Sequence, residues 1–123
     1  MSRERKDKGD RGEDRAAAFL RKEGYRILER NYRCTLGEMD IIAREGKTIV
    51  FVEVKTRSSD LFGSPQAAIG PQKQRRMTAI DLCYLKGQGW LGIPARFDVA
   101  AVSLDEAGER VMLYKNAFDA TGF

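Results

Sequence analysis

One run of β-branched and aromatic residues decides the fold of this chain: Thr48-Ile49-Val50-Phe51-Val52-Glu53-Val54-Lys55-Thr56-Arg57. Side chains alternate between the two faces of a strand, so Phe51, Glu53 and Lys55 share one face and the valines take the other. Glu53 and Lys55 therefore place charge on a strand whose other neighbours are mostly apolar. Because burying ionisable groups without a purpose is costly, this pair indicates a functional site.

A second strand is expected over residues 37–43, with Glu38, Asp40 and Ile42 on one face. The short turn over residues 44–47 joins the two runs and predicts a hairpin. If the two active faces coincide, Asp40, Glu53 and Lys55 converge. A one-residue slip in register would instead put them on opposite sides. Glu38 is expected to be a solvated residue at the strand edge.

The remaining segments predict an α/β domain over residues 10–123, after a flexible, charged lead-in over residues 1–9. A helix is expected to start at Asp10 and stop at Gly24, and a second to start at Pro71 and run to about Lys86. Further strands are expected over residues 25–33, 96–104 and 110–115. The crossover through the second helix favours a parallel partner for the strand before it. The expected architecture is a mixed central sheet flanked by helices.

The composition fits one soluble domain, with 123 residues, 42% hydrophobic and 33% charged. No apolar run approaches the ~20 residues that a membrane helix needs, and the charged N-terminus does not resemble a signal peptide. Cys34 and Cys83 lie far apart and form no disulfide or ligand spacing. We therefore expect a cytoplasmic protein with no membrane partner.

The charge balance favours a polyanionic partner such as nucleic acid, since 22 basic residues face 18 acidic ones and the net charge is +4. The chain contains no histidine. This excludes a Ser-His-Asp triad, a Cys-His pair and zinc held by histidine. Proton transfer would have to use other side chains or a metal-bound water.

Asp40 and Glu53 supply two carboxylates, and Mg²⁺ usually takes one or two carboxylates together with water and substrate phosphate. The backbone carbonyl of Val54 would add a further oxygen, and Mn²⁺ is an alternative ion. Lys55 would orient the attacking water or stabilise the developing charge. The structural alternative is an exposed strand face with cross-strand ion pairs.

Glu13 falls on the same helical face as Ala16, Ala17 and Leu20. It would be a third metal ligand if that face reaches the sheet. The alternative is that Glu13 is the fourth residue of a capping box that starts at Asp10.

Several basic residues are candidate contacts for nucleic-acid phosphates, although such charges are often only solvated surface. These residues are Arg57, Lys73, Arg75 and Arg76.

These motifs resemble the YraN-like family of uncharacterised bacterial proteins, which is related to the restriction-endonuclease-like superfamily and to archaeal Holliday junction resolvases. The resemblance covers nearly the whole domain and runs through the segments 12–13, 24–31, 37–40, 50–57, 73, 96–99 and 116–118. It implies an αβββαβ core and a PD-(D/E)xK-type site, with Asp40, Glu53 and Lys55 at the motif positions. It also implies that Glu13 matches an acidic residue on the first helix of the resolvases. Met39 stands where the motif has proline.

These residues together predict a Mg²⁺- or Mn²⁺-dependent endonuclease. DNA is favoured over RNA as its substrate, without a residue that separates the two, and branched or damaged DNA is one candidate within this class. A first alternative is a non-catalytic nucleic-acid-binding module with a vestigial nuclease site. A second is a protein-interaction domain whose sheet edge pairs with a copy of itself, which would give a homodimer.

Overall fold

The computed structural model describes residues 3–57, 69–105 and 108–118. In chain order the elements are α1 (Arg3–Lys22), β1 (Arg26–Cys34), β2 (Gly37–Glu45), β3 (Thr48–Arg57), α2 (Pro71–Gln88), β4 (Ala95–Asp105) and β5 (Gly108–Phe118). The predicted order of helix, three strands, helix and two strands is confirmed.

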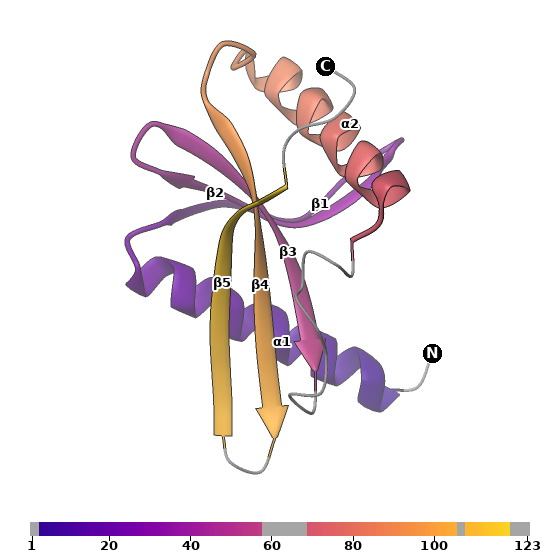
Figure 1. Ribbon diagram of the computed structural model, residues 1–123, viewed down its shortest axis with the longest axis vertical. Helices are drawn as coiled ribbons and strands as arrows, with labels where there is room; N and C mark the ends of the chain where they lie inside the picture. The colour runs from indigo at the N-terminus through magenta and orange to yellow at the C-terminus, as the bar shows by residue number, and fades with distance from the viewer. Residues whose placement is uncertain (1–2, 58–68, 106–107, 119–123) are drawn as a thin grey trace.

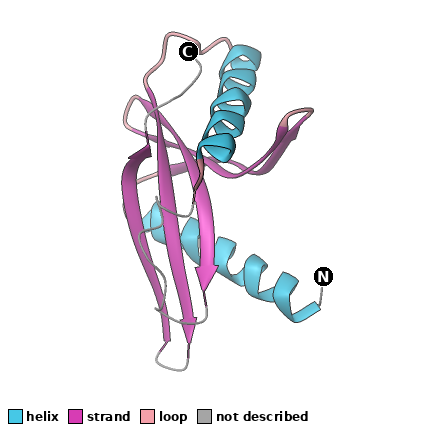
Figure 2. Ribbon diagram, turned by 45° about the vertical axis from the view of Figure 1, so that its right-hand side comes forward, coloured by secondary structure: helices cyan, strands magenta, loops and turns pink. Residues whose placement is uncertain are grey.

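The strands form one sheet in the order β1-β2-β3-β4-β5. Neighbouring strands are antiparallel except β3 and β4. These two run parallel because α2 returns the chain to the end of the sheet at which β3 began. The helices cover opposite faces of the sheet, as Figures 1 and 2 show. The predicted α/β class, with a mixed central sheet flanked by helices, is confirmed.

Helix α1 packs on the face that carries the valines of β3. Ala16, Ala17 and Leu20 are fully buried there against Val50 and Val52. The helix ends at Lys22, just before the predicted stop at Gly24, whose φ of 94° is one that glycine adopts without strain. Its last carbonyls are satisfied in this turn by the amides of Gly24 and Tyr25.

The predicted start of this helix is wrong, because α1 begins at Arg3 and not at Asp10. Charged residues such as those at its start are good helix formers, and a lack of apolar periodicity does not prevent them from extending a helix that is anchored further on. Glu13 therefore lies inside the helix and is not a capping residue. Whether residues 1–9 are flexible stays a prediction.

Helix α2 packs on the opposite face of the sheet. Met77, Ile80 and Tyr84 point to Phe51 and its neighbours on the sheet. The rings of Tyr84 and Phe51 meet edge to face with their centroids 6.1 Å apart. Pro71 begins the helix as predicted, since its missing N–H needs no partner there.

Strand β2 twists strongly at Asp40, so that residues two apart on it face different helices. Met39 packs with the α2 cluster, whereas Ile41, two residues further along the same strand, packs with the α1 cluster. Asn31 on β1, between the paired residues Arg30 and Tyr32, has a φ of 54°, in the left-handed region that asparagine tolerates better than most residues. Because of this twist, side chains from α1 and from α2 can both approach Asp40.

The sheet also forks at this point. The ladder between β2 and β3 runs from Glu45 and Thr48 to Ile41 and Val52. Beyond it, the ladder continues from β2 to β1 and from β3 to β4. Figures 1 and 2 show the outer half of the hairpin leaving the direction of β3–β5. Asp40 and Glu53 are the first residues of the two arms.

Cys34 and Cys83 are free thiols, as the sequence predicts. Neither α1 nor α2, the helices within the described ranges, has both the length and the apolar character needed to cross a bilayer.

Candidate active site

The fork brings Asp40 to β3. Its Oδ2 atom accepts a hydrogen bond from the backbone N–H of Val54, at 2.8 Å. This hydrogen bond lies just beyond the last pair of the β2–β3 ladder, Ile41 and Val52. It therefore holds the carboxylate between the diverging ends of β2 and β3. The faces that carry Asp40 and Glu53 coincide, and Asp40 lies beside Glu53 and not across the sheet from it.

Burial and the neighbouring carboxylate of Glu53 raise the pKa of Asp40 to about 7. The Val54 N–H opposes this shift because it favours the ionised form. Two carboxylates held close together in a half-buried site repel each other, and a cation between them would relieve that repulsion.

Two ammonium groups lie next to Glu53. Lys73, from the first turn of α2, donates a hydrogen bond from Nζ to Glu53 Oε1 at 2.9 Å. Lys55, two residues along β3, places its Nζ 3.8 Å from the same oxygen. Burial by itself would lower the pKa of Lys73, but the hydrogen bond and the charge of Glu53 outweigh it and the pKa is raised.

Glu13 reaches the fork from α1 and is only partly exposed. Within the described residues its buried Oε1 atom accepts no hydrogen bond, and the guanidinium of Arg30 lies 3.5 Å away. Burial raises the pKa of Glu13, although Arg30 and Asn31 oppose the shift. The charge of Glu13 is in turn one cause of the raised pKa of Asp40. The structure thus places Glu13 on the side of Asp40 that faces α1.

A glycine sets the height of Glu13 above the sheet. A Cβ atom at Gly12 would clash with Oγ1 of Thr56, so α1 lies against β3 here as closely as a backbone allows. A larger residue at position 12 would push this part of the helix, with Glu13, away from the strand.

The donor set of this site suits a hard divalent cation held by few protein ligands. In the described part of the chain no three acidic or cysteine side chains stand close enough to hold a metal ion by themselves. Asp40 and Glu53 with water and phosphate would meet the needs of Mg²⁺, which keeps several waters. The Oε1 atom of Glu13, which pairs with Arg30 at 3.5 Å but accepts no hydrogen bond within the described residues, is a further acceptor that such a water could use.

The basic candidates are spread around α2. Arg75 and Arg76 are exposed on its first half, whereas Lys73 points inward to Glu53. Arg57 is the last residue of β3, and its side chain lies outside the described residues. The predicted solvated residue Glu38 is exposed and pairs with Arg33 at 3.1 Å.

Arg30, which holds Glu13 in place, was not predicted from the sequence, and Lys73 was predicted as a phosphate contact and not as the partner of Glu53. Arg30 contacts Glu13 and also Asp14, at 2.7 Å, and Lys73 contacts Glu53. The sequence shows which residues are charged but not which of them form pairs, because each of these contacts joins segments far apart in the chain. Arg30 stands in an exposed, charge-rich strand, where one arginine among several carries no distinguishing signal.

A second charged cluster lies away from this site and was not predicted. Asp98 is fully buried and pairs with Arg96, whose guanidinium also donates to Glu45, at 2.7 Å, and to the hydroxyl of Tyr25, at 2.6 Å. Lys115 pairs with the other oxygen of Glu45 at 3.3 Å. Opposite charges two apart on an apolar strand, as at positions 96 and 98, were the signal that could have found it.

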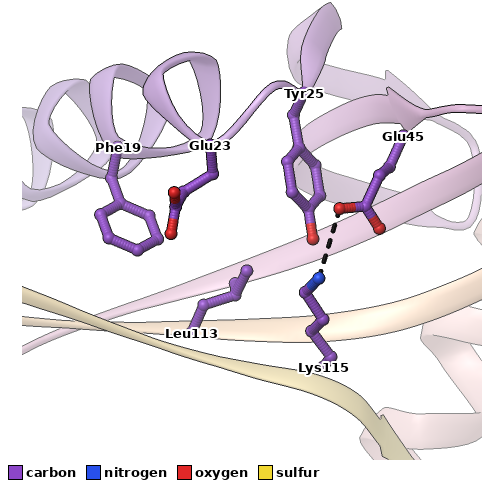
Figure 3. Close-up of a pocket in the computed structure, with 6 residues that line it drawn as sticks. All are labelled: Phe19, Glu23, Tyr25, Glu45, Leu113 and Lys115. Atoms are coloured by element: carbon purple, nitrogen blue, oxygen red, sulfur yellow. Dashed lines mark hydrogen bonds and ion pairs between the residues drawn. The ribbon is translucent and has the colours of Figure 1, made fainter.

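A pocket of about 440 Å³ lies beside this cluster, between the end of α1 and β5. Figure 3 shows its lining residues, with Phe19 and Leu113 forming its apolar part and Glu45 turned to Lys115. Both oxygens of Glu45 have basic partners, so its charge is neutralised within the protein. The cluster therefore acts as a tie between β2, β4 and β5.

The chain matches the model of the uncharacterised protein family UPF0102 over residues 12–102. It is 58% identical to a UPF0102 protein of Syntrophus aciditrophicus, over 90% of this chain and 87% of that protein. It is 50% identical to one of Geobacter sulfurreducens, over 90% and 88%, and 49% identical to one of Moorella thermoacetica, over 96% and 100%. Among solved structures, SfsA of Pyrococcus furiosus in complex with Ca²⁺ aligns with a TM-score of 0.37 and 17% identity, over 81% of this chain and 58% of that chain.

Proposed function

This chain belongs to the uncharacterised protein family UPF0102, and we propose that it is a metal-dependent endonuclease that hydrolyses phosphodiester bonds in DNA. The observation that carries the proposal is the meeting of Asp40 and Glu53 at the fork, with Lys55 beside them. A sheet has no structural use for two facing carboxylates in a half-buried position, because their repulsion costs stability. A divalent cation and a phosphodiester would use both.

Asp40 and Glu53 would hold Mg²⁺ or Mn²⁺, and the N–H of Val54 keeps Asp40 turned to the site. The bound ion would supply a water of lowered pKa and offset the negative charge of the phosphate. Lys55 would orient the attacking water or stabilise the charge that develops on the phosphate oxygens. Glu13 would accept a hydrogen bond from water on the α1 side of the site.

The surface around α2 supports a nucleic acid as the substrate. Gly70, at the N-cap, offers no side chain to the first amides of α2, and no acidic residue lies in its first turn. The helix start carries Lys73, Arg75 and Arg76 instead, which is unfavourable next to the positive end of a helix dipole. A backbone phosphate would satisfy the amides and these cations together. Arg57 would add a contact at the end of β3.

The substrate within this class is DNA, with branched or damaged DNA as the finer proposal. The described elements offer contacts to a backbone and no helix suited to reading base edges, which favours recognition by shape. A reducing, cytoplasmic location would suit the two free thiols.

The test is cleavage of labelled duplex, single-stranded and four-way-junction DNA with Mg²⁺ or Mn²⁺. Wild type is compared with Lys55→Ala and with Lys86→Ala, an exposed lysine in the last turn of α2. Cutting by wild type and Lys86→Ala, but not by Lys55→Ala, is expected. Cutting that survives both Lys55→Ala and Asp40→Asn would refute the proposal, since a contaminating nuclease would then explain it.

A second candidate function is a nucleic-acid-binding module with a vestigial site. The observation that favours it is the position of two lysines on Glu53, which neutralises the site without an ion. This function predicts salt-dependent DNA binding that is the same with and without metal. An increase in affinity on adding Mn²⁺ that Glu53→Gln abolishes would exclude it.

A self-associating sheet edge is the remaining proposal. The edge strands are β1 and β5, and Met112 on β5 is exposed. A homodimer formed through β5 would bury this side chain. Sedimentation of wild type and Met112→Lys at micromolar concentration tests it, and a wild-type monomer would rule it out.

A further inference from the structure

The ammonium of Lys73 occupies the position next to Glu53 that a cation bound by this carboxylate would occupy. Its Nζ atom is 2.9 Å from Oε1 of Glu53, a hydrogen-bond distance, and Lys55 approaches the same oxygen at 3.8 Å. The side chain of Glu53 is only 13% exposed, so little of its carboxylate remains open to solvent. Lys73, the closer of the two lysines, lies on α2, whereas Lys55 and Glu53 lie on β3.

We propose that Lys73 is a positioning residue that takes the place of the divalent cation on Glu53 and leaves it when the cation binds. This inference rests on the proposed function and adds a competition between a side chain and the metal at the same oxygen. The cation, arriving between Asp40 and Glu53, would meet the ammonium of Lys73 at close range. Because like charges so close repel strongly, Lys73 must move away.

The position of Lys73 makes this exchange feasible. Its side chain is 40% exposed, so a rotation of its flexible stem returns the ammonium to water without unfolding the helix. Lys73 also lies in the first turn of α2, where the helix dipole disfavours a cation. Glu53 is what holds the ammonium inward, and once the cation takes Glu53 the ammonium needs another anion.

A phosphate of the substrate is the anion that would then receive Lys73. Arg75 and Arg76 follow in the next turn of α2, near an N-terminus that no side chain caps. Nucleic acid that draws Lys73 outward frees Glu53 for the cation, and a cation that displaces Lys73 frees it for the phosphate. Binding of the two is therefore coupled, and by linkage the coupling is reciprocal.

The experiment is calorimetric titration of the full chain with Mn²⁺ in the absence of DNA. Lys73→Gln removes the competing charge and keeps a good helix former at that position. We expect Mn²⁺ to bind about fivefold more tightly to Lys73→Gln than to wild type, the amount that a partly exposed ion pair contributes. Lys73→Arg, which keeps the charge, should bind with nearly wild-type affinity.

Arg75→Gln is the matched control. It removes the same charge from the next turn of α2, at an exposed position that makes no ion pair with Glu53 among the described residues. Its affinity for Mn²⁺ should stay within about twofold of wild type because solvent screens exposed charges. An equal rise in Lys73→Gln and Arg75→Gln would overturn the inference, since general repulsion would then explain both.

Two further outcomes separate this inference from the proposed function. If Asp40→Asn abolishes Mn²⁺ binding but Lys73→Gln leaves the affinity unchanged or weaker, the inference fails and the metal site stands. If neither wild type nor Lys73→Gln binds Mn²⁺, both fail. NMR gives an independent readout: saturating Mg²⁺ should shift the terminal side-chain resonances of Lys73 and leave those of Lys86 in place.

Discussion

Asp81 gives a residue-scale prediction that concerns stability alone. It lies on α2, is 2% exposed, and its Oδ1 atom finds no hydrogen-bond partner within the described residues. Burial raises the pKa of Asp81 from 3.8 to about 7. As the pH rises from about 4 to about 7, the unfolded chain therefore loses this proton before the folded protein does. The contribution of Asp81 to folding stability falls over that window.

We expect Asp81→Asn to be more stable than wild type at about pH 8, by about 2–4 kcal/mol, and nearly equal to it at about pH 4. Urea denaturation of both proteins across this pH range measures the difference. Glu38→Gln, at an exposed carboxylate, should follow the wild-type profile. Parallel profiles for Asp81→Asn and wild type would contradict the prediction.

Glu13 gives a second prediction at this scale, and here activity and stability move apart. Glu13→Gln relieves the burial of a charge but also removes the ion pair of Glu13 with Arg30, at 3.5 Å. Because these effects oppose each other, the free energy of unfolding should change by less than about 1 kcal/mol. DNA cleavage should fall by about tenfold or more if Glu13 helps to position the attacking water. Cleavage rates and urea denaturation measure the two effects.

Asp14→Asn is the control for Glu13→Gln. Asp14 is the next residue on α1 and pairs with the same arginine, Arg30, but its side chain is 69% exposed. Its replacement should leave cleavage at the wild-type rate. Equal losses in the two variants would mean that both act through Arg30 and not through the site.

At the scale of elements, the contact between α1 and β3 predicts a substitution that helix propensity alone would misjudge. Gly12→Ala favours helix formation, yet its Cβ atom would clash with Oγ1 of Thr56. We expect a net loss of about 1–3 kcal/mol, the usual cost of overpacking. Thr56→Ala should recover part of this loss in the double variant. Urea denaturation of the single and double variants gives the coupling energy.

Gly87→Ala is the matched helix substitution, because nothing lies within 4 Å of a Cβ atom at Gly87 in α2. It should stabilise the protein by up to about 1 kcal/mol. If Gly12→Ala stabilises the protein as Gly87→Ala does, the close approach of α1 to β3 is wrong.

The elements show what the sequence could predict and what it could not. Strand β3 was predictable because its alternation of apolar and charged side chains is local and strong. The start of α1 was not, since charged residues continue a helix without any periodic signal. The fork at Asp40 was also invisible, because it depends on where two ladders stop. The convergence of Asp40 with Glu53 was predictable only as one of two registers.

Contacts between distant segments limit how much of the candidate site could be predicted from the sequence. Asp40, Glu53 and Lys55 could be predicted from two adjacent strands joined by a short turn. Lys73 was predicted as a phosphate contact, whereas the structure turns it to Glu53, from which 19 residues separate it. Which of several basic residues on a helix faces inward depends on how the helix docks, and the sequence pattern does not contain that angle.

At the scale of the whole molecule, the cluster around Asp98 ties the sheet together. Arg96→Met would leave a fully buried carboxylate without its counter-charge, at a cost of about 3–5 kcal/mol. The second change Asp98→Asn removes that charge and keeps an acceptor for the amide of Asn116. We expect the double variant to regain at least about 1 kcal/mol over the single variant. Thermal and urea unfolding test this, and a double variant less stable than Arg96→Met alone would contradict it.

The parallel pairing of β3 with β4 affects the chain while the ribosome is making it. Strand β3 is complete at Arg57, but its neighbour begins only at Ala95, which is translated a few seconds later at about 5–20 residues per second. During that interval one edge of an apolar strand stands open to other nascent chains. Glu53 and Lys55 place charge on one face of this open strand, and charges on an open strand discourage intermolecular pairing. The residues proposed for catalysis would thus also protect the unfinished sheet from aggregation.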